Sequence, residues 1–448
     1  MTYKNIFAGL MAAMLLASSC SGKCEDKCTC EGGYQVPAPE DVVMYQVNPR
    51  VFAPEKSFNA VAQHLDSIKA LGTNVVWFMP IYPVGQIKTV NSPYCISDYK
   101  GVNPEFGTLE EFKNVVSLCH EKGMSVIVDW VANHTSWDNK WMETNPEWYT
   151  HEDGVIVPPI KDWADVADLN FDNPDMRLAM IDAMKFWVTE VGIDGFRCDA
   201  ADFVPYDFWK QCCDSLRAIP DHKLLLLAEG KRKDHFDAGF EMNYAWDYLA
   251  ATRAVFNGGR RGPAQPATML FEADSAEYAG VPQGCVKLRF TTNHDESDKM
   301  SPIKEFGGER GSMAAFVAST FIHGGALVYG SQEIGYPGRI NFFRYVPMDW
   351  EANPALNKEY TDLLALYNSI PAIRKGEMTP YPDADVLKFS KSYEGDSVLV
   401  LVNVRHEDTY TETPAEWVGR QCTDLMTGAA ATLGEKIHLD PYQYIILR

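Results

Sequence analysis

The sequence predicts an α/β protein built on a (β/α)8 barrel (TIM barrel), and two observations support this prediction. The first is that four continuous apolar runs each end in an acidic residue, at Asp129, Asp199, Glu229 and Asp295. The second is their spacing, because Glu229 follows Asp199 by 30 residues and Asp295 follows Glu229 by 66. A barrel of about 250 residues uses roughly 30 residues for each strand–helix unit, so these intervals fit one unit and two units.

Apolar runs of this kind are typical of parallel strands that are buried on both faces. We therefore expect Asp129 at the end of strand 3, Asp199 of strand 4, Glu229 of strand 5 and Asp295 of strand 7. The longer interval between Asp129 and Asp199 leaves room for an insertion after strand 3. All four acids would then meet at the C-terminal end of one barrel, where such barrels carry their chemistry.

The other barrel elements follow from apolar periodicity. Strands are expected at 42–47, 74–80, 239–242, 289–292 and 326–329. Helices are expected at 58–71, 108–122, 245–256, 312–322 and 360–373. Thr108 is the predicted N-cap of the second of these helices, with acidic residues in the turn that follows it.

Four parts of the chain differ in pattern. Residues 1–20 are expected to be a signal peptide, 21–40 a linker, 41–375 the barrel and 376–448 a small antiparallel β-domain. The barrel contains an inserted domain at about 134–170, which is rich in Trp, Pro and Asp. Its four tryptophans could line a rim on which sugars stack, or could form the small core of the insertion.

Composition narrows the class of partner. The 448 residues carry a formal net charge of −21, which argues against nucleic acid or an anionic membrane surface as partner. An acidic surface suits a neutral substrate such as a sugar, although it also simply favours solubility.

The N-terminus predicts export. A lysine is followed by a short apolar core and then by small residues that lead to Cys20, which resembles a bacterial lipoprotein cleavage site. We expect lipidation of Cys20 and an outer-membrane lipoprotein facing the periplasm or the cell surface; the alternative is simple secretion. The spacing of Cys24, Cys28 and Cys30 lacks the paired pattern of a zinc site, so this segment is interpreted as a tether.

Arg197 and Asp199 suggest the chemistry. They are two residues apart on an expected strand, so their side chains point to one face. An adjacent cation would lower the pKa of Asp199 and keep it ionised, as a glycosyl nucleophile must be. Glu229 would have its pKa raised by an apolar strand and by like charges, as suits a general acid. The alternative is a structural Arg–Asp pair at a strand end.

At this point the sequence resembles the α-amylase family, glycoside hydrolase family 13. Four of its motifs occur in order, from about Tyr45 onwards: Asp129-Trp-Val-Ala-Asn133-His134, Gly195-Phe-Arg197-Cys-Asp199, Leu227-Ala-Glu229 and Thr292-Asn-His294-Asp295. The resemblance implies a barrel with a domain B after strand 3, a C-terminal β-domain and α-glucan or malto-oligosaccharide substrates.

The resemblance also implies roles for individual residues. Asp199 matches the nucleophile, Glu229 the general acid/base and Asp295 the acid that stabilises the transition state. Substrate-binding residues would be Tyr94, His134, Arg197 and His294, and Asp129 and Asn133 would support the site. Cys95 stands where the family usually has an aspartate after the tyrosine.

Two alternatives share these residues, namely a transglycosylase or α-glucosyl isomerase and an inactive glycan-binding protein. A metal-dependent hydrolase would need more clustered histidines than His134 and His294. No cofactor is expected. Calcium, which many relatives hold near domain B, is also not expected to bind tightly. Asn133 matches one of its usual ligands, but Asn170 and Phe203 stand where an Asp and a His are usual.

Overall fold

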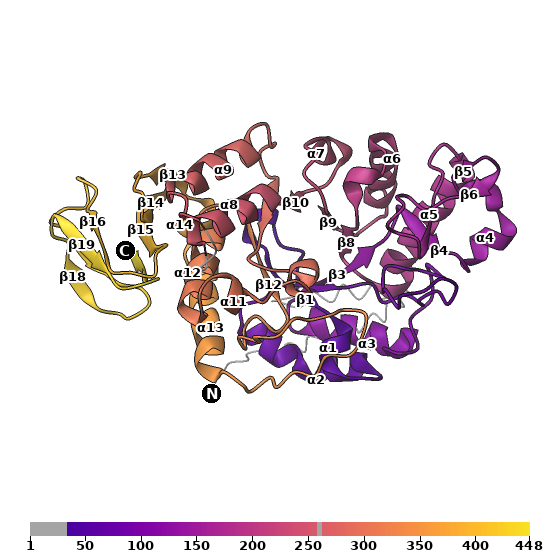
Figure 1. Cartoon of the computed structure of the whole chain (residues 1–448), viewed down its shortest axis with the longest axis horizontal. Helices are drawn as coiled ribbons and strands as arrows, with labels where there is room; N and C mark the ends of the chain where they lie inside the picture. The colour runs from indigo at the N-terminus through magenta and orange to yellow at the C-terminus, as the bar shows by residue number, and fades with distance from the viewer. Residues whose placement is uncertain (1–33, 258–261) are drawn as a thin grey trace, which may run out of the picture. The chain divides into compact units, whose positions relative to one another are not determined.

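The computed structural model describes residues 34–257 and 262–448. Within these residues eight parallel strands close into a barrel, in the order β1-β12-β11-β10-β9-β8-β3-β2 (Figure 1). The strands are β1 (Val43–Val47), β2 (Val75–Phe78), β3 (Ser125–Trp130), β8 (Gly195–Cys198), β9 (Leu225–Ala228), β10 (Met242–Tyr244), β11 (Val286–Arg289) and β12 (Gly325–Tyr329). The predicted (β/α)8 fold is therefore confirmed.

Amphipathic helices surround the strands. The longer ones are α2 (Ser57–Ala70), α3 (Leu109–Glu121), α5 (Pro174–Phe186), α6 (Tyr206–Arg217), α8 (Trp246–Phe256), α9 (Thr268–Tyr278), α12 (Glu309–Thr320) and α13 (Pro354–Ser369). Short ones are α1 (Pro49–Phe52), α7 (Asp234–Ala238), α10 (His294–Ser297), α11 (Pro302–Glu305) and α14 (Pro371–Lys375). A short 3-10 turn, η1 (Pro39–Asp41), precedes β1, and a π-helical turn, η3 (Trp187–Val191), ends the α5 segment.

Local chemistry explains two of these boundaries. Thr108 caps α3 as predicted, because its hydroxyl accepts from the Glu111 amide at 3.2 Å while Glu111 accepts from the Thr108 amide at 2.8 Å. Gly195 begins β8 at φ 150°, and a Cβ there would lie 1.9 Å from the Leu225 carbonyl oxygen. Only glycine therefore lets β8 approach β9 so closely.

Two strands differ from the prediction. The sixth strand is Met242–Tyr244 rather than 239–242, because Gly239 takes φ 118° and ends α7, so the residues after it form a turn. The seventh is Val286–Arg289 rather than 289–292. Phe290 and Thr291 are buried but lie beyond the ladder, so their burial does not mark a strand.

The segment between β3 and α5 folds back on itself. It contains β4 (His134–Ser136), α4 (Lys140–Thr144), η2 (Pro146–Trp148), β5 (His151–Glu152), β6 (Val155–Ile156) and β7 (Val166–Asp168). β4 pairs antiparallel with β7, which holds the two ends of the excursion together. Trp141 packs edge-on against Trp148 and at a tilt against Tyr99, so Trp141 and Trp148 form the small core of this segment.

The C-terminal region is an antiparallel β-domain, drawn in yellow in Figure 1. Its strands are β13 (Glu377–Pro380), β14 (Val386–Tyr393), β15 (Asp396–Asn403), β16 (Thr409–Glu412), β17 (Gln421–Thr423), β18 (Ala430–Thr432), β19 (Lys436–Leu439) and β20 (Tyr444–Leu447). Buried Lys391 of β14 donates to the carbonyl oxygen of Ile322, at 3.0 Å, and thereby joins this domain to the barrel. None of the helices in the described ranges is both long and apolar enough to cross a membrane.

Candidate active site

The C-terminal ends of the barrel strands bring the predicted acids together. Asp129 lies in β3 directly beside Arg197 of β8 in the strand register. The Asp199 amide donates to the Trp130 carbonyl at 2.8 Å, and the Glu229 amide donates to the Cys198 carbonyl at 2.9 Å. These backbone bonds extend the ladder by one residue beyond β8 and β9, which fixes both carboxyls at the mouth of the barrel.

Arg197 contacts three of these carboxyl groups. Its side chain is fully buried, and its Nη1 donates to Asp129 at 2.7 Å and to Asp199 at 2.8 Å. Its Nη2 lies 3.0 Å from Glu229 Oε1, and its Nε donates to the Tyr244 hydroxyl at 3.1 Å. One guanidinium therefore fixes three carboxyls, a geometry that lysine could not reproduce.

Glu229 has a second fixed contact. Ala200, the residue after Asp199, takes a left-handed conformation with φ 45°. Its amide donates to Glu229 Oε2 at 2.7 Å. A non-glycine residue in this region of φ/ψ space is strained, and here the strain accompanies a contact between two candidate catalytic segments.

The pKa of Asp199 differs from the sequence-based expectation. We expected Arg197 to hold it low, but burial and the charge of Glu229 outweigh the arginine and raise the pKa of Asp199 well above its ordinary value. Burial likewise raises the pKa of Asp129 to about 7, despite the opposing charge of Arg197. The expected lowering was wrong because sequence spacing reveals the neighbouring cation but not the loss of water.

The remaining acid and the two histidines are also affected by burial. Asp295 lies in α10 rather than at a strand end, and burial raises its pKa. Burial lowers the pKa of His134 to about 4 and, together with the charge of Arg197, lowers that of His294 well below 6.5. Both imidazoles are therefore neutral near pH 7, where each carries one N–H donor and one bare nitrogen.

Tyr94 occupies the position expected of a platform. Its ring stacks on His294 with centroids 5.3 Å apart, and its hydroxyl donates to Asp129 Oδ2 at 3.1 Å. The neighbouring Cys95 is buried, and its Sγ donates to the Asp165 carbonyl at 3.2 Å. The cysteine thus ties the Tyr94 loop to the domain B segment instead of presenting a carboxylate. Asn133 supports His134, with its Nδ2 3.2 Å from the ring Nδ1.

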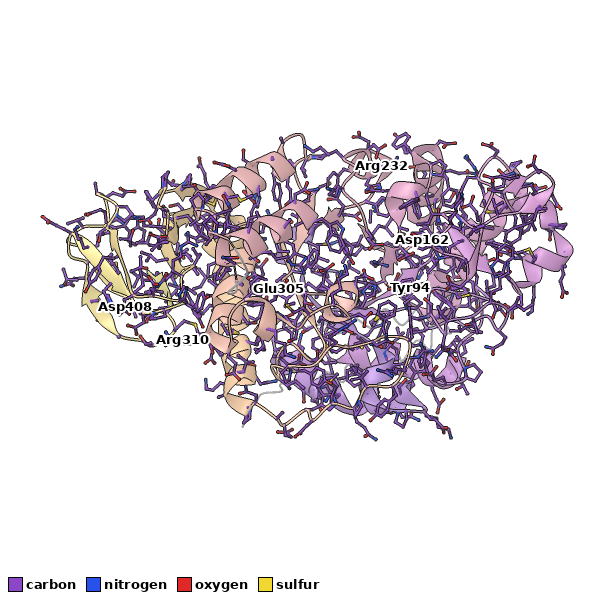
Figure 2. The ribbon with its side chains drawn as sticks, in the orientation of Figure 1. Tyr94, Asp162, Arg232, Glu305, Arg310 and Asp408 are labelled. Atoms are coloured by element: carbon purple, nitrogen blue, oxygen red, sulfur yellow. The ribbon has the colours of Figure 1, made fainter. Side chains whose placement is uncertain are left out.

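These residues surround a cavity of about 400 Å³. Figure 2 labels two residues of its wall, Tyr94 and Asp162, which come from the loop after β2 and from domain B. Its lining consists of Val90, Ser92, Tyr94, His134, Asp162, Trp163, Asp165, Val166, Asp199, Ala200, Glu229, His294, Asp295, Phe342 and Phe343. All three candidate catalytic acids are present.

Sequence reasoning missed part of this wall. It did not identify Phe342, which packs edge-on against Tyr94 and His294, or the acids Asp162 and Asp165. Trp163 is the one tryptophan of the insertion that lines the cavity. Trp141 and Trp148 instead pack against each other in the core of the insertion. Loop residues without periodicity carry no signal in a single sequence that would have placed them here.

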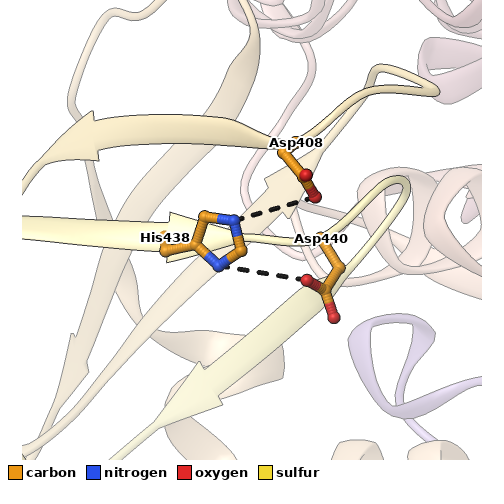
Figure 3. A group of neighbouring side chains, drawn as sticks. All are labelled: Asp408, His438 and Asp440. Carbon is orange, nitrogen blue, oxygen red and sulfur yellow. Dashed lines mark ion pairs between the residues drawn. The ribbon is translucent and has the colours of Figure 1, made fainter.

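One usual calcium-ligand position is occupied by an aromatic ring. Phe203, which stands at the usual histidine position of a calcium site, packs at a tilt against Trp163 with ring centroids 5.5 Å apart and supplies no oxygen ligand. Calcium prefers six to eight oxygens, several of them charged, and the absence of tight calcium binding stays a prediction. Asp408, His438 and Asp440 form a further group within reach of one ion, but they are exposed and belong to the C-terminal domain (Figure 3).

Comparison with known proteins identifies the family. The family model described as "Alpha amylase, catalytic domain" matches residues 56–164 and 160–362, and "Maltogenic Amylase, C-terminal domain" matches 377–446. The chain belongs to the α-amylase family. The enzymes of this family are glycoside hydrolases that act on O-glycosyl bonds.

Individual α-amylase relatives resemble most of the chain. Alpha-amylase MalA of Haloarcula japonica is 28% identical over 419 residues, covering 88% of this chain but only 60% of that protein's length. A cyclomaltodextrinase from a Bacillus species is 25% identical over 438 residues, covering 83% of this chain and 74% of the relative. A maltogenic α-amylase from Thermotoga neapolitana superposes with a TM-score of 0.82 at 25% identity, covering 92% of this chain and 99% of that structure.

Proposed function

We propose that this α-amylase family member is a retaining hydrolase that cleaves α-glucosidic bonds of starch, maltodextrins or related oligosaccharides. The observation that carries the proposal is that Asp199 and Glu229, which both line one cavity, both contact the single guanidinium of Arg197. The volume of this cavity lies in the range of about 300–1,000 Å³ typical of small-molecule sites. The proposed substrate is an α-glucan or malto-oligosaccharide, as the family suggests.

In the first step, Glu229 donates its proton to the glycosidic oxygen while Asp199 attacks the anomeric carbon. The bond from that carbon to the leaving oxygen breaks, and a bond to a carboxyl oxygen of Asp199 forms, which gives a covalent glycosyl-Asp199 intermediate. In the second step, water attacks the same carbon, Glu229 takes the water's proton and Asp199 is released. Two inversions at one carbon retain the α configuration.

The shared guanidinium prepares the two acids for different roles. Arg197 donates a well-oriented hydrogen bond to Asp199, whereas its contact with Glu229 is an ion pair without hydrogen-bond geometry. Burial and the neighbouring carboxyl raise the pKa of Asp199, and the hydrogen bond from Arg197 opposes that rise and favours the ionised nucleophile. A protonated Glu229 beside an ionised Asp199 is the state that the first step requires.

The other residues would stabilise the oxocarbenium-like transition state. Asp295 places a third carboxylate near the reacting ring, where its charge matters more for a developing cation than for a neutral sugar. Neutral His134 and His294 can donate hydrogen bonds to sugar hydroxyls without adding an opposing positive charge. Tyr94 offers a ring face, fixed by its stacking on His294, on which the sugar can lie.

The experiment that tests this function is product analysis on amylose, maltotriose, pullulan and isomaltose with the native protein and with Asp199→Asn. The native protein should release smaller sugars from at least one of these α-glucans. The isosteric variant should lose nearly all turnover while keeping the same thermal unfolding midpoint within a few degrees. Unchanged turnover in Asp199→Asn would contradict the proposal.

A second candidate is transfer of the glycosyl group to a sugar instead of water. Phe203 is 56% exposed and packs on Trp163 of the cavity wall, so an apolar surface follows the segment that carries Asp199. A sugar acceptor held there would compete with water for the intermediate. Products longer than the substrate, formed at high maltotriose concentration and reduced in Phe203→Ser, would favour this activity.

We further propose that the protein is exported and anchored through a lipid on Cys20. The support is the N-terminal sequence alone, because residues 1–33, and with them the signal peptide, Cys20 and most of the linker, lie outside the described residues. An outer-membrane location, with the barrel in the periplasm or at the cell surface, would bring the enzyme to glucans outside the cytoplasm.

A further inference from the structure

A chain of buried hydrogen bonds runs from β1 to the carboxylate cluster. Gln46 of β1 places its Nε2 2.8 Å from His294 Nδ1. The opposite ring nitrogen, Nε2, lies 2.6 Å from the Tyr94 hydroxyl, which in turn donates to Asp129 Oδ2 at 3.1 Å. Gln46 lies outside the cavity lining, and nothing in the proposed mechanism requires it to touch the substrate.

The contacts of Asp129 determine which group donates and which accepts in these hydrogen bonds. Asp129 accepts from Arg197 Nη1 at 2.7 Å and from the Trp77 indole at 3.3 Å, and neither of these groups can accept a hydrogen bond. The ionised carboxylate therefore also accepts the single hydrogen of the Tyr94 hydroxyl. The tyrosine oxygen is then free only to accept, so the hydrogen between Tyr94 and His294 belongs to the imidazole.

The same reasoning fixes Gln46. A neutral imidazole has one hydrogen, and with that hydrogen on Nε2 the Nδ1 atom is a bare acceptor. It faces the amide NH₂ of Gln46, while Oε1 of Gln46 is buried without a partner among the described residues. Turning the amide would give Oε1 a hydrogen bond only by moving the imidazole hydrogen to Nδ1, and it would leave Tyr94 with two acceptors for one hydrogen.

We propose that Gln46 is a positioning residue that supports this tautomer of His294 from the side opposite Tyr94: by donating to the bare Nδ1, it helps to hold the imidazole hydrogen on Nε2. His294 Nε2 also lies 3.4 Å from Asp295 Oδ2, so this tautomer presents a hydrogen, and not a lone pair, to that carboxylate. In the proposed glycosidase, to which this inference is tied, this N–H, which here donates to Tyr94, is the one hydrogen that His294 can offer to a sugar hydroxyl beside Asp295.

The tautomer can be measured without substrate, so the test is independent of the proposed function. Nitrogen-15 NMR of the full chain with labelled histidine distinguishes protonated from bare ring nitrogens, and the His294 signals are identified by their loss in His294→Gln. Spectra are recorded at about pH 8, because the pKa of Asp129 is about 7 and the carboxylate must be ionised. The native protein should show His294 with a protonated Nε2 and a bare Nδ1.

Two variants of Gln46 separate positioning from packing. Gln46→Glu supplies only acceptors and should draw a hydrogen onto Nδ1. Gln46→Met keeps the volume but leaves the tautomer to Tyr94 alone, so a minor signal of His294 protonated on Nδ1 should appear beside the native one. Loss of one well-placed hydrogen bond should lower kcat by about 10- to 100-fold on a substrate that the native enzyme cleaves. KM should change less, because the hydrogen matters most where charge develops.

The control is Gln332→Met, which also removes a buried glutamine amide, one that donates to Thr291 and Tyr360 away from the cavity. It should leave both the His294 signals and kcat unchanged. A native His294 protonated on Nδ1 would overturn the proposal without any variant. So would a fall in kcat in Gln46→Glu and Gln46→Met with His294 signals identical to those of the native protein.

Discussion

Replacing Arg197 by methionine should uncouple the three carboxyls that it holds. Methionine fills a similar volume but leaves Asp129, Asp199 and Glu229 without the buried cation that contacts them at 2.7, 2.8 and 3.0 Å. Removing one partner of a buried ion pair costs about 3–5 kcal/mol, because the other charge stays buried and uncompensated. We expect a loss of this size in the free energy of unfolding near pH 8.

The loss should depend on pH, and its sign follows from the pKa shifts. The pKa of Asp129 is raised from 3.8 to about 7 even with Arg197 present, which corresponds to about 4 kcal/mol against ionisation. A carboxyl whose folded-state pKa is raised contributes stability below its unfolded pKa, and this contribution is lost as the pH rises through the folded pKa. Without Arg197 the pKa values of Asp129 and Asp199 rise further, so the variant loses more stability as the pH rises. At about pH 5, where Asp129 is protonated in both folded proteins, the deficit should be small.

The assay is urea unfolding of both proteins at several values between about pH 5 and pH 8, combined with kcat/KM on a cleaved glucan. Arg289→Met is the matched control, because Arg289 is also fully buried and pairs with Asp274 and Glu277 away from the cavity. The control should lose stability but keep kcat, whereas Arg197→Met should lose both. A stability deficit for Arg197→Met that is equal at all pH values would refute the electrostatic reasoning.

The remaining predictions concern the acid, the metal and the anchor. Glu229→Gln should nearly abolish turnover of natural glucans but lose less on glucosides with a good leaving group, which need no proton in the first step; equal losses on both would contradict its role as acid. A chelator should leave activity unchanged, since the calcium ligand set is incomplete; activity that is lost and then restored by calcium alone would contradict this. Cys20→Ser should move the protein from the membrane to the soluble fraction, and identical fractionation of both forms would exclude the lipid anchor.

Much of the barrel could be predicted because parallel strands buried on both faces leave continuous apolar runs. β8 and β9 illustrate this, each followed directly by its acid. β11 shows the limit, because Phe290 is buried beyond the end of the ladder, and burial alone does not distinguish a strand from a loop packed at the mouth of the barrel. Asp295, which follows this loop, lies on a short helix that Asn293 caps, and not on a strand.

The candidate site was predictable in its residues but not in its electrostatics. Arg197 and Asp199 share one face because strands have a period of two, and the sequence contains that information. The raised pKa of Asp199 depends on burial and on the charge of Glu229, 30 residues away, which only the closed barrel brings together. The contact between Gln46 and His294 joins β1 to α10 across 248 residues and has no signature in a single sequence.

The stereochemistry of the first product tests the central claim most directly. An α-glucan is mixed with the enzyme in an NMR tube, and the anomeric protons of the new reducing end are followed before mutarotation equilibrates them. A covalent intermediate on Asp199 requires two inversions, so the account predicts that the α anomer appears first. A β anomer released first would mean a single inversion, and would contradict the role of Asp199 as nucleophile.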